Sequence, residues 1–103
     1  MLDLNKLCGM SGKTAIITGA ASGIGAGIAR FFADAGINVI MADINEELAL
    51  KVEKEITDAG NKAHFMKCNV TKEADCKALA DAVAEKYGRI DILVNCAVVV
   101  LRY

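Results

Sequence analysis

The sequence lacks an excess of charge of either sign and any apolar run long enough to span a membrane. Twelve basic and thirteen acidic side chains give a net charge of −1, and no segment gathers more than a few like charges. The chain therefore has no electrostatic footprint for nucleic acid or for an anionic membrane surface. The N-terminus also lacks the apolar core of a signal peptide, so we expect a cytoplasmic protein.

The sequence also lacks the cysteine spacings of disulfide frameworks and zinc sites. Cys8, Cys68, Cys76 and Cys96 include no C-x-x-C pair, and three of them fall within segments of apolar periodicity. We therefore expect reduced thiols, no metal site and no redox function. His64 lies four residues before Cys68, which on a strand separates the two by about 13 Å, too far for a shared ion.

Proline is absent, and what remains is the composition of a packed chain. Of the 103 residues, 54% are apolar and 24% are charged, and the mean hydropathy is +0.36. Such a composition argues against disorder. The length allows one small domain at most, with a thin core.

The most informative segment is the glycine-rich run after the apolar residues 15–17. Residues 18–25 read Thr-Gly-Ala-Ala-Ser-Gly-Ile-Gly. A strand that enters such a turn and continues as a helix points backbone N–H groups at an anion, because side chains at the glycines would hold a phosphate away. The segment therefore predicts a loop that binds a pyrophosphate.

Strand and helix patterns alternate along residues 13–97 without a linker. Strands are expected at 13–18, 38–42, 63–68 and 90–95. Helices of this length between strands require parallel pairing with right-handed crossovers. We therefore predict an α/β fold, a Rossmann-like doubly wound parallel sheet truncated after its fourth strand, with element order βαβαβαβ and strand order 3-2-1-4.

Three helices connect these strands. The N-caps are expected at Asn45 and Thr71 for the second and third helices. Glycines mark the ends of all three helices. The residues expected on the buried faces are Ile24, Ile28, Phe31, Phe32 and Ala35 in the first helix, Leu48, Val52, Ile56 and Ala59 in the second, and Cys76, Leu79, Ala80, Val83 and Tyr87 in the third.

The glycine spacing is specific enough to suggest a family. Thr18 and the glycines of the loop have the T-G-x-x-x-G-x-G spacing of the short-chain dehydrogenase/reductase family, which the chain resembles over residues 13–97. Asp43 after the second strand, Asn69-Val70 after the third, and residues 93–97 at the fourth stand in register with it. The resemblance implies a partial dinucleotide-binding domain at 13–97, flanked by an extension at 1–12 and a divergent tail at 98–103.

Asp43 carries the expected cofactor preference. A carboxylate at this place accepts hydrogen bonds from both adenosine ribose hydroxyls and repels a 2′-phosphate. Ser22 and Ile44 put no cation where a 2′-phosphate would need one. NAD is therefore expected over NADP. The alternative is that Asp43 merely begins a turn before Asn45.

The resemblance assigns the remaining contacts. The Asn69 side-chain oxygen would accept from the adenine amino group. The family keeps an asparagine at Asn95 and a glycine where this chain has Val98, a side chain that would crowd the nicotinamide ribose. The expected cofactor-binding residues are Gly19, Ser22, Gly23, Ile24, Gly25, Asp43, Ile44, Asn69, Val70, Asn95 and Ala97.

No catalytic residue is expected in these 103 residues. In the family a serine, a tyrosine and a lysine four residues after it transfer the proton that accompanies hydride transfer. Here the residue four positions after Tyr87 is Asp91, and Tyr103 is the last residue. We expect the NAD-binding portion of an oxidoreductase that acts on a ketone or secondary alcohol, such as a 3-oxoacyl or sugar-alcohol group. The alternative is a truncated product, an inactive nucleotide-binding or assembly module.

The fourth strand predicts association. Residues 92–101 form a nearly continuous apolar run, and the sequence given holds no further strand to pair with it. Such an edge is a template for another chain. We therefore expect a homo-oligomer formed through the fourth strand, with aggregation as the competing outcome.

Overall fold

The computed structural model describes residues 11–96, which form a parallel sheet of four strands and three helices. The elements are β1 (Thr14–Thr18), α2 (Gly23–Asp34), β2 (Asn38–Asp43), α3 (Glu46–Asp58), β3 (Ala63–Lys67), α4 (Glu73–Tyr87) and β4 (Ile92–Asn95). The expected order βαβαβαβ is confirmed, and the strand limits differ from the expected ones by at most two residues.

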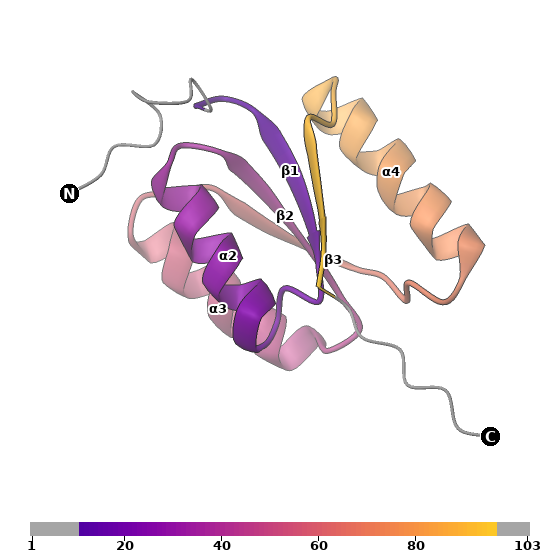
Figure 1. Ribbon diagram of the computed structural model, residues 1–103, viewed down its shortest axis with the longest axis horizontal. Coiled ribbons are helices and arrows are strands. Elements are labelled where there is room, and N and C mark those ends of the chain that lie inside the picture. The colour runs from indigo at the N-terminus through magenta and orange to yellow at the C-terminus, as the bar shows by residue number, and fades with distance from the viewer. Residues whose placement is uncertain (1–10, 97–103) are drawn as a thin grey trace.

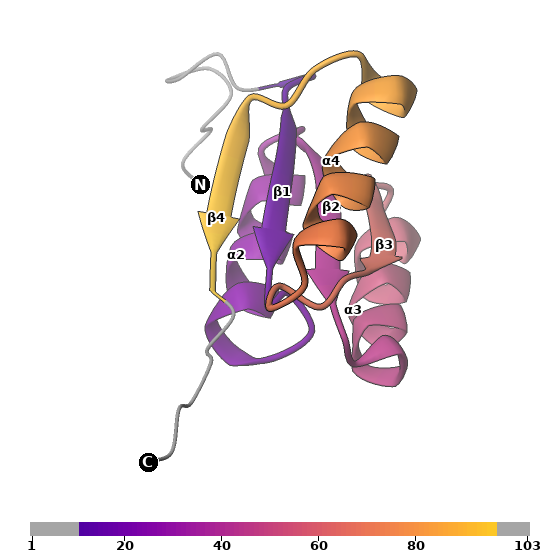
Figure 2. The same cartoon turned by 90° about the vertical axis from the view of Figure 1, so that its right-hand side faces the viewer.

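The sheet has the order β3-β2-β1-β4, with every neighbouring pair parallel, as the sequence predicts. β1 lies inside the sheet, and all five of its residues are buried. α2 and α3 cover one face of the sheet and α4 covers the other (Figures 1 and 2). Because the strand order reverses beside β1, a ligand crevice is expected beyond the carboxyl ends of β1 and its neighbours.

The buried face of α2 differs from the expected one. Its buried residues are small: Gly25, Ala26, Ala29 and Ala33. Ile24 and Phe31, which were expected inside, are 78% and 54% exposed, whereas Ile28 and Phe32 pack partly against the core. The reason is close approach, because a Cβ atom on Gly25 would lie 2.1 Å from the Gly19 carbonyl oxygen. Larger side chains cannot enter this interface.

α3 begins as predicted. The side chain of Asn45 accepts a hydrogen bond from the backbone N–H of Leu48 at 3.1 Å, which is the geometry of an N-cap. The buried residues are Ala49, Val52 and Ile56, whereas Leu48 is 40% exposed. Ala59 is also exposed, at the cap position that ends the helix.

The start of α4 is not the expected one. The N-cap is Lys72, without a side-chain capping bond, and not Thr71. The Thr71 hydroxyl is used in the preceding loop, where it donates to the Asn69 side-chain oxygen at 2.6 Å. The end of α4 is as predicted, because Gly88 has φ +78°, a left-handed conformation that favours glycine. None of the helices within residues 11–96 is long and apolar enough to cross a membrane.

Asp91 joins the start of β4 to the start of β1. Its Oδ2 accepts a hydrogen bond from the Thr14 N–H at 2.9 Å, and the Arg89 Nε donates to Oδ1 at 2.6 Å. The side chain is 9% exposed. The hydrogen bond from Thr14 holds the pKa of Asp91 below its usual value, and Arg89 adds to this effect. The charged carboxylate therefore stabilises the folded chain.

This pKa gives the expected dependence of stability on pH. Since the pKa of Asp91 is lower in the folded chain, its stabilisation is present above the usual carboxyl pKa and is lost as pH falls through the lowered value. Asp91→Asn should melt at a lower temperature than wild type at pH 7, and the difference should shrink in acid. Thermal melts followed by circular dichroism test this. A difference that stays constant with pH would contradict it.

Candidate functional site

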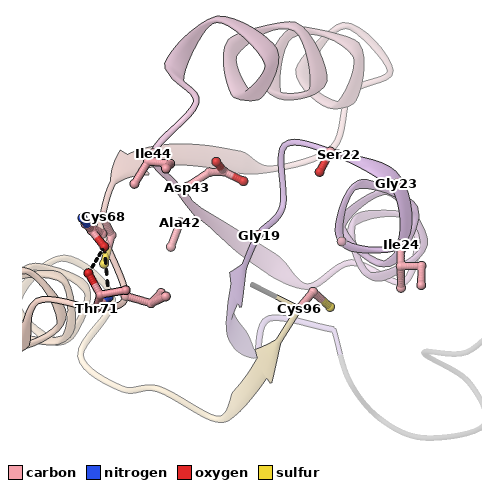
Figure 3. A pocket seen from close by; sticks show the side chains of 13 residues that line it. Gly19, Ser22, Gly23, Ile24, Ala42, Asp43, Ile44, Cys68, Thr71 and Cys96 are labelled. Atoms are coloured by element: carbon pink, nitrogen blue, oxygen red, sulfur yellow. Dashed lines mark hydrogen bonds between the residues drawn. The ribbon is translucent and has the colours of Figure 1, made fainter. Parts of the chain in front are cut away.

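A cavity of about 600 Å³ opens beyond the carboxyl ends of the strands, where the topology places a ligand crevice (Figure 3). The segments that line it follow β1, β2, β3 and β4. Its lining residues are Gly19, Ser22, Gly23, Ile24, Gly25, Ala42, Asp43, Ile44, Cys68, Asn69, Val70, Thr71 and Cys96. Nine of the eleven residues expected to bind the cofactor are among them.

The glycine loop forms one wall of this cavity. Gly19 and Gly23 have φ of +67° and +51°, so the turn needs residues without a Cβ atom. The Gly19 N–H donates to the Ala42 carbonyl at 2.9 Å, which fixes the loop to the end of β2. Ser22 precedes α2, and its exposed side chain makes no capping hydrogen bond. The first turn of a helix has backbone N–H groups without intrahelical partners, and here that turn borders the cavity.

Asp43 lies at the end of β2 and faces the glycine loop (Figure 3). Its Oδ2 accepts from the Ala21 N–H at 3.0 Å, and its Oδ1 accepts from the Asn45 N–H at 2.8 Å. The second bond is the turn that the alternative interpretation predicted. The Asp43 carboxylate can still accept hydrogen bonds from a ligand, because a carboxylate has about four acceptor sites and these two bonds use two of them. Among the described lining residues, Asp43 is the one with a formal charge at neutral pH.

The loop after β3 uses the Asn69 oxygen internally. Its Oδ1 accepts from both the N–H and the hydroxyl of Thr71, at 3.0 and 2.6 Å. The Asn69 backbone N–H donates to Asp75 at 3.0 Å. An adenine amino group would therefore compete with Thr71 for an oxygen whose two lone pairs are already used. Val70 lies beside Asn69 in the wall of the cavity, as expected.

One expected residue that the structure describes, Asn95, does not line this cavity. Asn95 lines a second cavity of about 300 Å³ bordered by α4, and its Oδ1 accepts from the Thr18 hydroxyl at 2.7 Å. The Cys96 N–H donates back to the Thr18 hydroxyl at 3.2 Å. These bonds tie β4 to β1. Ala97 lies outside the described residues, as do residues 1–10 of the extension predicted at 1–12 and the tail at 98–103.

Four lining residues were missed by the motif. Ala42, Cys68, Thr71 and Cys96 each stand directly beside a residue that was predicted. The signal that would have found them is position, since each lies at or just after the carboxyl end of a predicted strand. Within the range 11–96, no group of three or more histidine, cysteine, aspartate or glutamate side chains is placed to hold a metal ion.

Three features define the class of proteins to which this fold belongs, the dinucleotide-binding α/β domains. They are the parallel sheet with this strand order, the glycine loop at the start of the first helix and the acidic residue at the end of the second strand. The family model of the short chain dehydrogenases matches residues 13–102, beyond residue 97, where the resemblance was expected to end. The chain belongs to the short-chain dehydrogenase family, a family of oxidoreductases.

Relatives of known structure or activity agree with this assignment. The chain is 48% identical over 88 residues to a 7alpha-hydroxysteroid dehydrogenase of Escherichia coli K12, a match over 85% of this chain and 34% of the relative. It is similar to a crystal structure of a hydroxysteroid dehydrogenase from Escherichia coli (TM-score 0.80, 48% identity, 84% of this chain and 37% of that one). A metagenomic short-chain oxidoreductase in complex with NADP has a TM-score of 0.84 at 39% identity, over 87% of this chain and 41% of that one. The chain thus spans about a third of the length of the curated relatives.

Proposed function

We propose that this chain is the NAD-binding portion of a short-chain-type oxidoreductase. The observation that carries the proposal is the position of Asp43 in a cavity that the glycine loop also lines, with the Ala21 N–H of the loop donating to the Asp43 carboxylate. The loop and the first turn of α2 would hold the pyrophosphate, and Asp43 would accept hydrogen bonds from the adenosine ribose. Ile44, which is 63% exposed, and Val70 would offer apolar contact to the adenine.

The preference for NAD over NADP follows from charge. A 2′-phosphate at the ribose would lie beside the Asp43 carboxylate, and no lysine or arginine is among the described lining residues. The neighbour solved with NADP is a short-chain oxidoreductase, so the fold by itself does not exclude NADP, and the proposed preference depends on the residues around the ribose.

The test is a pair of calorimetric titrations with NAD and NADP on the 103-residue chain. We expect weak binding of NAD and at least tenfold weaker binding of NADP, which is about 1.4 kcal/mol of binding free energy. AMP serves as the control, because it keeps the adenosine ribose and lacks the nicotinamide half. Equal or tighter binding of NADP would contradict the proposed preference, and failure to bind any of the three would contradict the nucleotide site.

For the whole activity we infer hydride transfer between NAD and a ketone or secondary alcohol, of the 3-oxoacyl or sugar-alcohol type, in a cytoplasmic protein. The support is family membership.

We expect no turnover by the 103-residue chain alone. Binding and orientation of a cofactor supply little rate when no group donates a proton to the substrate oxygen. The measurement follows NADH absorbance with a panel of ketones and alcohols and a sample whose mass has been verified. Turnover that vanishes in Asp43→Arg would contradict the expectation, because a contaminating enzyme would not respond to that change.

We also infer that the chain self-associates through β4. The opposite edge strand, β3, is partly covered, because the Phe65 N–H donates to the carboxylate of Glu53 on α3. β4 pairs with β1 on one side and with no other strand among residues 11–96, and its Leu93 is 67% exposed. A two-fold pair of β4 strands would continue the sheet and cover this residue.

The expected result is a dimer or a larger species in light scattering at micromolar concentration. Leu93→Lys should shift the mass toward the monomer, because a charge on the exposed face of an edge strand opposes pairing. Leu50→Lys is the matched control, since Leu50 is 45% exposed on α3, away from the edge. A wild-type monomer, or an equal response of the two variants, would contradict association through β4.

A further inference from the structure

The loop that follows β3 brings together two cysteines that the sequence separates. Cys68 directly follows β3, and Cys76 lies in the first half of α4. The chain turns back between them, where the N–H of Lys72 donates to the carbonyl of Asn69 at 3.0 Å. Reduced, unpaired thiols were predicted because the four cysteines include no C-x-x-C pair and three of them fall within segments of apolar periodicity. The turn places the two residues against the same face of the sheet.

Three observations place the two thiols together. Both residues line the second cavity, and Cys76 packs against the buried cluster that contains Cys68. The Cys76 Sγ donates to the carbonyl oxygen of Val70, two residues after Cys68, at 3.7 Å. Cys76 also contributes, after burial, to raising the pKa of Cys68, an effect that requires the two side chains to lie close together. Both cysteines are free thiols in the structure.

The two cysteines differ in how accessible they are to a reagent in solution. Cys68 is 2% exposed, whereas Cys76 is half-buried, and both line a largely apolar cavity. A reagent in solution therefore meets Cys76 first, and Cys68 is placed to react second. An accessible thiol that attacks the oxidant and a neighbouring thiol that resolves the mixed disulfide together form an intramolecular disulfide.

We propose that Cys68 and Cys76 form a dithiol modification site that a small disulfide oxidant converts to an intramolecular disulfide. With oxidised glutathione, the Cys76 thiolate attacks one sulfur of the oxidant, forms a mixed disulfide and releases one glutathione thiolate. Cys68 then loses its proton, attacks the Cys76 sulfur and displaces the second glutathione. Two protein thiols are oxidised, and one glutathione disulfide is reduced to two glutathione thiols.

The same geometry fits a reagent that bridges two thiols without oxidation. Phenylarsine oxide binds two thiols through its arsenic atom and releases one water molecule. We expect one phenylarsenic group per folded chain, held between Cys68 and Cys76. Cys96 lines the first cavity and not the second, so it supplies a matched control.

The experiment oxidises the reduced, folded chain with glutathione disulfide, alkylates the remaining thiols in denaturant and digests with trypsin. Cleavage after lysine places Cys68 in the peptide 68–72 and Cys76 in the peptide 73–77, so a disulfide joins two short peptides of known mass. We expect this linked pair to be the main oxidised product in wild type and Cys96→Ser. Cys76→Ser should abolish it.

A parallel arm with phenylarsine oxide uses intact mass. We expect one adduct per chain in wild type and in Cys96→Ser, and loss of at least nine-tenths of it in Cys76→Ser. Denaturation before labelling should remove the selectivity for this pair. Any of three results would overturn the proposal: a disulfide between Cys68 and Cys96, disulfides between two chains as the main product, or full alkylation of both Cys68 and Cys76 after oxidation. Cys76 is half-buried on the helix surface, so its serine variant retains the fold, which circular dichroism verifies.

Discussion

Gly25→Ala should destabilise the domain by about 3 kcal/mol or more, although it adds a single methyl group. The added Cβ atom would lie 2.1 Å from the Gly19 carbonyl oxygen and 2.7 Å from its carbon, and both are backbone atoms held by the turn after β1. α2 must then move away from the sheet, and the glycine loop moves with it. Loss of this amount is a large fraction of the stability of a small domain.

Gly27→Ala is the matched control for this prediction. Gly27 lies in the same helix, is exposed, and has nothing within 4 Å of the position that a Cβ atom would take. Alanine is the better helix former, so this variant should gain about 0.5–1 kcal/mol. Urea denaturation followed by circular dichroism measures both variants. Equal midpoints for the two would show that the contact between α2 and the loop does not limit stability.

Ile44→Arg should shift the cofactor preference toward NADP. Ile44 is 63% exposed beside the carboxylate of Asp43, so a guanidinium at this position can reach a 2′-phosphate without entering the core. Hydrogen bonds to charged groups contribute about 1.5–3 kcal/mol, which corresponds to an increase of about tenfold or more in NADP affinity. The hydrogen bonds that Asp43 accepts from the N–H groups of Ala21 and Asn45 remain in place, so the melting temperature should stay close to that of wild type.

Asp43→Asn tests the contribution of the negative charge separately from that of hydrogen-bond acceptance. An asparagine in this place keeps one oxygen acceptor and loses the negative charge, so NAD should bind less tightly and the discrimination against NADP should fall. Because Asp43 also accepts from the N–H groups of Ala21 and Asn45, some loss of stability is expected as well. Titrations of both variants with NAD and NADP, beside thermal melts, measure these effects. An unchanged ratio of the two affinities in both variants would contradict the role of this position.

The details that the sequence did not predict share one cause. The face of α2 was predicted from its large apolar residues, yet Gly25 and the alanines are buried because the helix approaches the loop too closely for larger side chains. Thr71 was expected to cap α4, and instead its hydroxyl bonds to Asn69. In both places an interaction with residues outside the helix outweighs the preference of the isolated element.

The sequence by itself determined the order of the elements, the strand order by analogy, the glycine loop and the position of Asp43. These features depend on patterns within single elements: apolar periodicity, N-cap and stop residues, and glycines at fixed spacing. The tertiary structure alone decided which side chains share a cavity. Asn95 belongs to the second cavity and bonds to Thr18, and Cys68 meets Cys76 across a turn. Such contacts depend on how closely helices approach the sheet, and on which face of it, and that is set when the whole core packs.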